Sequence, residues 1–321
     1  MIINTGMRTD IPAFYSEWLM NRIHEGYVYV RNPYYMLQVS KYDLSPEVVD
    51  CLAFCTKNPH PMIKYLDELK EKYNMFWFVT ITPYGKDIEP NVPFVDRVIE
   101  DFKVLSTKLG SNAVALRYDP IFLSEEWTIE KHIESFEYIL KELFGYTEDV
   151  TISFLDMYEK VKKNAPNIRP PKFEEEKILA KEFARIGRKY NMTIHGCCEN
   201  PNLKDLGIDI SGCMSKEIVE KAIKMKLNTP KNQSKRLNDG KQTCNCVMGN
   251  DIGAYNSCMH LCTYCYANLD KELVKQNYKK HNPNSPFLIG ELTNEDRITS
   301  SKQKSWKLKE DNEQIRFFWF I

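Results

Sequence analysis

The chain has no hydrophobic run long enough to cross a membrane. Its two most apolar stretches, residues 75–81 and 317–321, are far shorter than the roughly 20 residues of a transmembrane helix. The N-terminus lacks the basic and apolar regions of a secretory signal, so we expect a cytoplasmic protein with no membrane partner. Net charge is also absent, because 44 basic residues balance 44 acidic ones. Composition therefore provides no general attraction to nucleic acid.

Cysteine is the residue type that points to chemistry. The chain has ten cysteines, and clustered thiols in a reducing compartment bind metal more often than they form disulfides. Cys258, Cys262 and Cys265 form a CxxxCxxC run on one short loop. Three thiolates can hold a cubane 4Fe–4S cluster and leave one iron without a protein ligand. Such an open iron can bind a small molecule, as the open position of a catalytic metal site does.

The same cysteines also permit a zinc site. A zinc knuckle would take His260 or an upstream cysteine as its fourth ligand. Zinc ribbons usually contain paired CxxC elements, however, and this chain has one CxxC, Cys262 with Cys265, and no partner for it. The spacing therefore favours the iron–sulfur cluster.

A second group of cysteines lies upstream. Cys197 and Cys198 adjoin the end of a predicted strand, and Cys244 and Cys246 form a CxC pair. Together, Cys198, Cys213, Cys244 and Cys246 supply four thiolates, enough for a second 4Fe–4S cluster or for a structural zinc ion. Both metals stay open here, with iron–sulfur slightly favoured.

Six short apolar runs, each followed by a helical pattern, predict a parallel sheet covered by helices. The runs are residues 2–5, 51–56, 76–82, 113–118, 150–155 and 192–197. Helix signals include Thr128 as an N-cap and an amphipathic segment over residues 173–190. Cys51 and Cys55 lie inside an apolar run and are expected to be core residues.

These patterns predict an α/β fold built as a partial TIM-like (β/α)6 barrel. We expect the barrel core in residues 1–212 and a cysteine-rich cluster-binding region in residues 213–280. Residues 281–321 are expected to form a partly mobile tail whose aromatic end docks on the domain or on a partner. A further helix is expected over residues 266–277.

Charged and polar residues follow the predicted strands directly. In parallel barrels the carboxyl ends of the strands build the active site, although polar residues also end strands because loops contact water. Charge immediately after an apolar strand favours function. The candidate catalytic residues are Arg8, Asp10, Lys57, Arg117 and Asp119. The candidate cofactor-binding residues are Tyr84, Glu199 and Tyr264.

The CxxxCxxC run with Tyr264 before its last cysteine resembles the cluster motif of radical S-adenosylmethionine (radical SAM) enzymes. The resemblance implies that S-adenosylmethionine binds the open iron and is cleaved reductively by an electron from an external donor. It also implies that Tyr264 packs against the adenine or shields the cluster. In such enzymes the cofactor supplies the chemistry, and the protein supplies placement and shielding.

Several phrases along the chain resemble the bacterial and archaeal family known as domain of unknown function 1848. They begin at Arg8, Thr56, Thr82, Arg117 and Asp251, keep their order, and span roughly residues 1–270 with the cysteine loop. The resemblance implies a TIM-like barrel with an iron–sulfur site and radical SAM chemistry. It implies no substrate.

Three functions remain open from the sequence. The favoured one is a radical SAM enzyme that acts on a small molecule or a peptide. The second is a non-catalytic module stabilised by zinc. The third is a nucleic-acid-modifying enzyme, because residues 264–267 also resemble DNA photoproduct lyases and residues 302–309 are rich in lysine.

Overall fold

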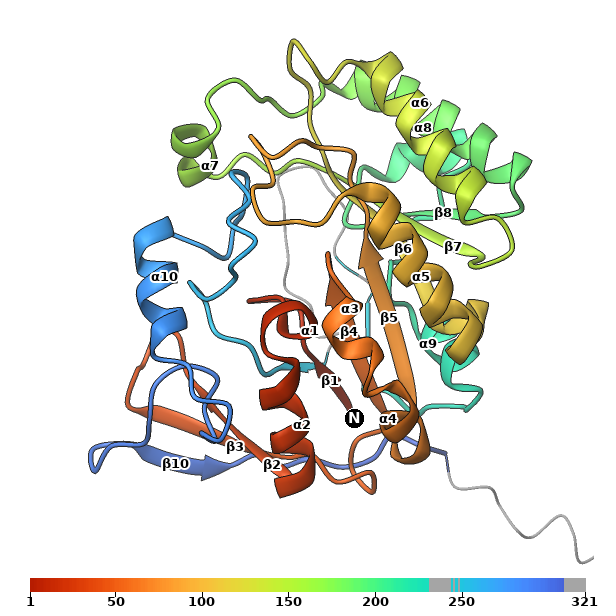
Figure 1. Ribbon diagram of the computed structural model, residues 1–321. Coiled ribbons are helices and arrows are strands. Elements are labelled where there is room, and N and C mark those ends of the chain that lie inside the picture. Colours follow the sequence, from red (N-terminus) through yellow and green to blue (C-terminus); the bar gives the residue numbers. More distant parts are fainter. Residues whose placement is uncertain (231–243, 245, 248, 309–321) are drawn as a thin grey trace, which may run out of the picture.

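The computed structural model describes residues 1–230, 244, 246–247 and 249–308. Its main element is a seven-stranded parallel sheet in the order β8-β7-β6-β5-β4-β1-β9 (Figure 1). The strands are β1 (Ile2–Asn4), β4 (Cys51–Thr56), β5 (Met75–Thr80), β6 (Val114–Ile121), β7 (Asp149–Phe154), β8 (Thr193–Gly196) and β9 (Asn250–Asp251). The predicted α/β class is confirmed, and each of the six predicted strands is present close to its predicted position.

Hydrogen bonds between strands do not close the sheet. The order follows the chain from β1 to β8, and β9 then returns to pair with β1 on its free side. Within the described residues, β8 and β9 are therefore the two edges. Strand pairing establishes an open parallel sheet flanked by helices.

Helices cover one face of the sheet. They are α2 (Ser16–Glu25), α4 (Leu66–Lys72), α5 (Val95–Leu109), α6 (Ile129–Glu142) and α8 (Phe173–Lys189). Alternate strand residues such as Leu52, Trp77 and Leu116 pack beneath them, with Phe102 and Phe136 from the helices. The predicted N-cap of α6 is confirmed, because the side chain of its capping threonine accepts a hydrogen bond from a first-turn N–H. Shorter helices are α1 (Ile11–Phe14), α3 (His60–Ile63) and α7 (Glu159–Asn164).

The opposite face of the sheet has its own, smaller core. Because side chains alternate along a strand, Ala53, Phe76 and Ala115 point away from the outer helices and pack with Ile218 and Val219. The last two residues belong to α9 (Lys216–Ile223), which lies after β8 and the 3₁₀ turn Pro201–Leu206. Another 3₁₀ turn, Ser111–Ala113, precedes β6. One short helix thus covers the inner face, where it leaves room for the cysteines described below.

A second sheet was not predicted. It contains β2 (Tyr27–Arg31), β3 (Gln38–Asp43) and β10 (Arg297–Ser300), with β3 in the middle (Figure 1). The strands β2 and β3 are antiparallel, whereas β10 runs parallel to β3. The start of the predicted helix over residues 266–277 was wrong, since α10 spans Lys271–Lys279 and begins where Asp270 caps it. The Asp270 carboxylate accepts from the Glu272 and Leu273 N–H groups, so this N-cap marks the first turn.

The later part of the chain packs on the N-terminal part. Trp18 donates its indole N–H to the Ser285 carbonyl at 2.9 Å, and β10 joins β3. The predicted docking of the aromatic end concerns residues 309–321, which lie outside the described residues. The predicted domain boundaries after residues 212 and 280 stay predictions. Within the described residues, no helix is both long enough and apolar enough to span a membrane.

Candidate functional site

The loop that follows β9 carries three free, half-buried cysteines. These loop thiols are Cys258, Cys262 and Cys265. Two segments hold the loop, one after β1 and one after β5. The His260 imidazole is hydrogen-bonded to Asp10 Oδ2 at 2.8 Å, and the Thr263 N–H donates to the Ile88 carbonyl at 3.0 Å. The loop thiols therefore lie at the carboxyl ends of the parallel strands, where the sequence predicts the site.

Asp10 connects three pieces of chain at this position. Its Oδ1 caps α1 by accepting from the Ala13 N–H at 3.0 Å. Its Oδ2 accepts from the Lys57 backbone N–H and contacts His260 Nε2, each at 2.8 Å. The other ring nitrogen of His260 lies 3.3 Å from the Asn91 carbonyl oxygen. Asp10 thus positions the loop, and both ring nitrogens of His260 have polar partners.

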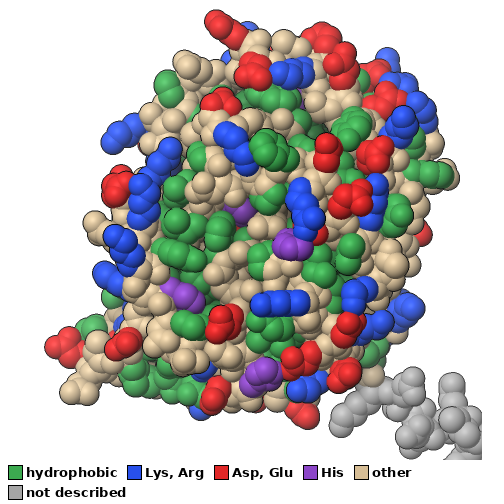
Figure 2. All heavy atoms as spheres, viewed as in Figure 1, with side chains coloured by type: hydrophobic (Ala, Val, Ile, Leu, Met, Phe, Trp, Pro, Cys, Tyr) green, Lys and Arg blue, Asp and Glu red, His purple; other side chains and the backbone are tan. Residues whose placement is uncertain are grey.

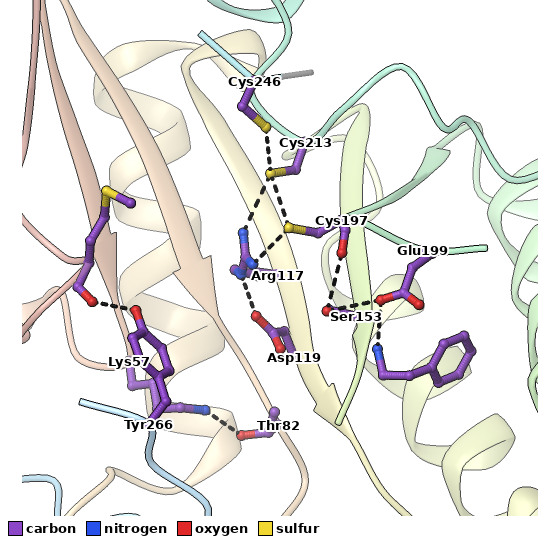
Figure 3. A network of polar contacts seen from close by, with 12 residues as sticks. Lys57, Thr82, Arg117, Asp119, Ser153, Cys197, Glu199, Cys213, Cys246 and Tyr266 are labelled. Carbon is purple, nitrogen blue, oxygen red and sulfur yellow. Dashed lines mark hydrogen bonds and ion pairs between the residues drawn. The ribbon is translucent and has the colours of Figure 1, made fainter. Parts of the chain in front are cut away.

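Lys57 and Glu89 form a buried ion pair beside the loop. Lys57 Nζ lies 2.9 Å from both Glu89 Oε1 and Thr82 Oγ1, and the Thr82 hydroxyl donates to the same carboxylate oxygen at 2.7 Å. The Tyr264 hydroxyl also donates to Glu89. Burial opposes the charge of Lys57, but Glu89 and then Cys262 outweigh it and raise the lysine pKa. This pair keeps one cation close to the loop thiols (Figure 3 shows Lys57 and Thr82).

The loop thiols stand apart from one another. No sulfur–sulfur contact joins Cys258, Cys262 and Cys265 in the described part of the chain. Burial raises the pKa of each of the three thiols, and for Cys262 the charges of Glu89, Cys265 and Cys258 add to the effect of burial. The three sulfurs therefore interact electrostatically without touching.

A second set of cysteines gathers on the inner face of the sheet. This inner thiol group consists of Cys197, Cys198, Cys213, Cys244 and Cys246. The Cys213 sulfur lies 3.6 Å from that of Cys197 and 3.3 Å from that of Cys246 (Figure 3). Cys198 is hydrogen-bonded to Cys197 and Cys244. Four of these residues are the predicted second metal site. Cys197, which lies next to Cys198, joins them and is missing from the predicted ligand set.

Arg117 connects the inner thiol group to the carboxyl ends of the strands. Its Nε donates to Asp119 Oδ2 at 2.7 Å. Its Nη2 lies 3.4 Å from the Cys197 sulfur, and its Nη1 lies 3.7 Å from that of Cys213. Hydrogen bonds from Cys198 and Cys213, followed by the charge of Arg117, lower the pKa of Cys197 despite its burial. Of the candidate catalytic residues, Arg117 thus contacts the inner thiol group, and Asp119 is joined to it through Arg117.

Arg8 lies on the other side of the loop, near β9. Its Nε is 3.6 Å from Asp251 Oδ1, and its guanidinium lies 5.6 Å from the centre of the Tyr255 ring. Burial raises the pKa of Asp251 to about 6, although backbone N–H groups and Arg8 oppose the shift. About a quarter of the Arg8 side chain is exposed (24%), so it can still reach a ligand.

The three candidate cofactor-binding residues have separate surroundings. Tyr84 donates to the Pro120 carbonyl at 2.6 Å and stacks on Phe122. The Tyr264 ring lies 6.1 Å from that of Tyr84 and is buried in the same aromatic cluster. Glu199 accepts from the Ser153 hydroxyl and from a β7 backbone N–H, each at 3.0 Å (Figure 3). Two of them therefore form an aromatic wall behind the loop, and Glu199 holds the end of β8 against β7.

A comparison with protein families gives one match, which covers residues 2–267. The matching family is described as a domain of unknown function, DUF1848. The chain belongs to this family. The comparison with curated proteins found no match.

In this DUF1848 protein, Glu89 is a second residue that sequence reasoning missed, besides Cys197. It accepts hydrogen bonds from Lys57, Thr82 and Tyr264 and is almost fully buried. A signal was present, because Glu89 lies in the phrase over residues 82–90 by which the family resemblance was noted. Like Asp10, Glu89 is an acidic residue on a loop that follows a parallel strand.

The donor set of the loop thiols fits an iron–sulfur cluster. All three thiols are free, and Lys57 provides a nearby positive charge to balance thiolates. Both ring nitrogens of His260 are engaged by Asp10 and Asn91, so the histidine does not compete as a ligand. The side chains do not form a ready-made site, since no group of three or more His, Cys, Asp or Glu residues in the described ranges is arranged to hold a metal ion.

Proposed function

We propose that this DUF1848 protein is a radical SAM-type enzyme whose loop thiols hold a 4Fe–4S cluster. The observation that supports it best is the position of three free thiols on one loop, which Asp10 and Glu89 hold at the carboxyl ends of parallel strands. When bound, such a cluster would supply one electron to S-adenosylmethionine and so break a carbon–sulfur bond of its sulfonium.

The chain's own residues would bind and shield the reactants. Arg8 is partly exposed, and its guanidinium suits the carboxylate of S-adenosylmethionine or of a substrate. Lys57 is held by Glu89 and would balance thiolate charge. The buried ring of Tyr264, with Tyr84 behind it, would exclude water from one side of the loop. Asp10 engages the His260 ring, which would then not act as a ligand.

The finer parts of the proposal follow from the same features. We propose that the parallel sheet curves into a partial TIM-like barrel, because its strands follow the chain in sequential order and β9 returns to β1. The enzyme would act in the cytoplasm on a small molecule or a peptide and take its electron from an external donor.

Two other functions are less well supported. A zinc-stabilised module would need a fourth ligand near the loop, and His260 is already engaged at both nitrogens. A nucleic-acid-modifying enzyme would need a basic face. Basic and acidic side chains intermingle over the face in Figure 2, which gives no support to such a surface there.

The proposal is tested with anaerobically reconstituted protein. We expect about four irons and four sulfides per chain at the loop, and 5′-deoxyadenosine after addition of S-adenosylmethionine and dithionite. Cys258→Ala should lose this product, whereas Cys51→Ala, which removes a buried thiol elsewhere, should keep it. Absence of 5′-deoxyadenosine from fully loaded protein would overturn the proposal.

A further inference from the structure

The inner thiol group is unusual because half of the chain's ten cysteines meet at one place. They are residues 197 and 198, residue 213, and residues 244 and 246. Buried cysteines often serve as small apolar residues, but such residues need no polar partners. Here the Arg117 guanidinium is directed at the sulfurs of Cys197 and Cys213. The Met214 backbone N–H donates to the Cys246 sulfur at 3.3 Å. These buried sulfurs therefore have polar partners, which a purely apolar role does not require.

The sulfur–sulfur distances identify the kind of metal that fits. Ligands of one tetrahedral ion with metal–sulfur bonds of about 2.3 Å lie about 3.8 Å apart. The contacts of Cys213 with Cys197 (3.6 Å) and with Cys246 (3.3 Å) are close to this distance. In a cubane each thiolate binds a different iron, so the sulfurs are separated by the width of the cluster. The distances therefore match one ion better than a 4Fe–4S cluster.

We propose that the inner thiol group binds a single thiophilic divalent cation of the zinc class. Cys197, Cys213 and Cys246 would provide three ligands, and Cys198 or Cys244 the fourth. Binding requires the side chains to rearrange, because no three of these cysteines are arranged to hold an ion as the described structure stands. The Cys213–Cys246 contact, for example, is shorter than the tetrahedral distance by about half an ångström. Arg117 donates to two of the ligand sulfurs and is the positioning residue of the site.

The place of the inner thiol group in the fold indicates what such an ion would do. Cys197 follows β8 directly, and Cys246 precedes β9 by four residues. The strands β8 and β9 are the two edges of the open sheet. A shared ion would tie the two edges together across the inner face, where no backbone hydrogen bonds between β8 and β9 are present in the described residues. The site is structural and does not depend on the proposed reaction at the loop.

The test isolates the inner thiol group by removing the loop thiols. The full-length variant with Cys258→Ala, Cys262→Ala and Cys265→Ala is purified without oxygen, stripped of metal and titrated with cobalt(II). We expect one equivalent to bind with the visible spectrum of tetrahedral thiolate coordination and to be displaced by one equivalent of zinc. Adding Cys213→Ser should abolish this spectrum, whereas adding Cys51→Ala, which removes a thiol from the same apolar core, should leave it unchanged.

A second measurement keeps the proposal falsifiable if Cys213→Ser does not fold. Arg117→Gln in the same background should weaken zinc binding about 10- to 100-fold in a competition assay. Zinc removal should also speed hydrogen exchange in β8 and in residues 213–227, but not in β5. The proposal is overturned by unchanged cobalt binding in Cys213→Ser, by unchanged affinity in Arg117→Gln, or by a Cys197–Cys213 disulfide in oxygen-free protein. Iron with acid-labile sulfide in the variant without loop thiols would overturn it as well.

Discussion

The loop thiols and the inner thiol group are arranged in opposite ways. Cys258, Cys262 and Cys265 are neighbours in the sequence, yet their sulfurs do not touch in the described structure. Cys197 and Cys213 are 16 residues apart, and their sulfurs lie 3.6 Å from each other. Separated thiols around one loop suit a cluster with several metal atoms, whereas touching thiols suit a single ion. Sequence spacing and sulfur spacing therefore carry different information about the metal.

The supports of the two thiol groups also differ. The loop is held by two buried acidic side chains, Asp10 with His260 and Glu89 with Lys57. The inner thiol group is held by the sheet, by α9 and by one cation, Arg117. Substitutions of the buried acids should therefore affect the loop and leave the inner thiol group intact.

Among the substitutions considered, Glu89→Ala should cause the largest loss of stability, and it should affect the loop thiols but not the inner thiol group. It leaves the Lys57 ammonium buried without its carboxylate and removes the acceptor of Tyr264. Loss of one partner of a buried pair costs about 3–5 kcal/mol in the free energy of unfolding, which urea denaturation measures. Iron binding at the loop should fall, and zinc-class binding at the inner thiol group should persist.

The matched control for Glu89→Ala is Glu100→Ala. Glu100 pairs with Lys103 at 3.1 Å on the surface of α5 and is mostly exposed. Removing such a pair costs about 0–1 kcal/mol. Equal losses of stability in the two variants would show that the Lys57–Glu89 pair does not support the loop.

Asp251, which lies near the loop, should make the free energy of unfolding depend on pH. Burial raises its folded-state pKa to about 6, above the value of 3.8 for an unperturbed aspartate. The folded state thus binds the Asp251 proton more tightly than the unfolded state does. The protonated carboxyl therefore stabilises the folded state fully below pH 3.8, and this stabilisation is lost as pH rises through about 6. The loss amounts to about 3 kcal/mol at most. Unfolding free energies measured from pH 4 to pH 7 should fall more steeply in the wild type than in Asp251→Asn; parallel curves would contradict the assignment.

Asp10→Asn should have a smaller effect. An amide can still cap α1 with its oxygen, but its NH₂ group is only a donor and cannot accept the hydrogen bonds that Asp10 Oδ2 makes with the Lys57 N–H and with His260. Loss of hydrogen bonds to a charged group costs about 1.5–3 kcal/mol. Thiol-reagent kinetics should show faster reaction of the loop thiols and an unchanged rate at the inner thiol group.

A similar substitution in α10 provides the control for Asp10→Asn. Asp270 accepts from the Glu272 and Leu273 N–H groups through Oδ1 alone. Asparagine caps helices about as well as aspartate, so Asp270→Asn should leave both stability and thiol reactivity unchanged. A change as large as that of Asp10→Asn would mean that Asp10 acts only as a helix cap.

Thr128→Ala should have the smallest effect and should not distinguish the two thiol groups. The Thr128 hydroxyl accepts from the Lys131 N–H at 3.3 Å and caps α6, which packs on the outer face of the sheet. Loss of an N-cap costs about 1 kcal/mol. Metal content should stay the same at both sites, and a selective loss at either would reveal a connection that the contacts do not show.

The sequence was a good guide where its patterns are local. The continuous apolar runs that became β4 and β5 are readable because parallel strands are buried on both faces. The second sheet was missed although Tyr27–Arg31 alternates in burial along its length, a pattern of period two that is typical of a half-buried strand. The third strand of this sheet, β10, comes from near the other end of the described chain and pairs with β3. No local sequence pattern predicts such a pairing.

In the candidate site, too, the sequence predicts the residues that local patterns mark but not their partners. Asp10, Lys57 and the loop thiols could be named in advance because charge or sulfur directly follows strands or lies on one short loop. The partners of these residues could not be named. Glu89 reaches Lys57 across 32 residues, and His260 reaches Asp10 across 250. Such contacts depend on the tertiary packing of the loops at the carboxyl ends of the strands.

By itself, the sequence determined the parallel α/β sheet, the positions of its six main strands and the loop that carries three spaced cysteines. Periodicity and spacing are properties of neighbouring residues, so they can be read without knowing the fold. Only the tertiary structure decided that Glu89 and Asp10 hold that loop, and that Cys197 joins Cys213 and Cys246 beneath Arg117. These contacts form because the sheet brings the ends of distant strands together. Burial of an unpaired charge or thiolate costs free energy, so such groups are paired where they are buried.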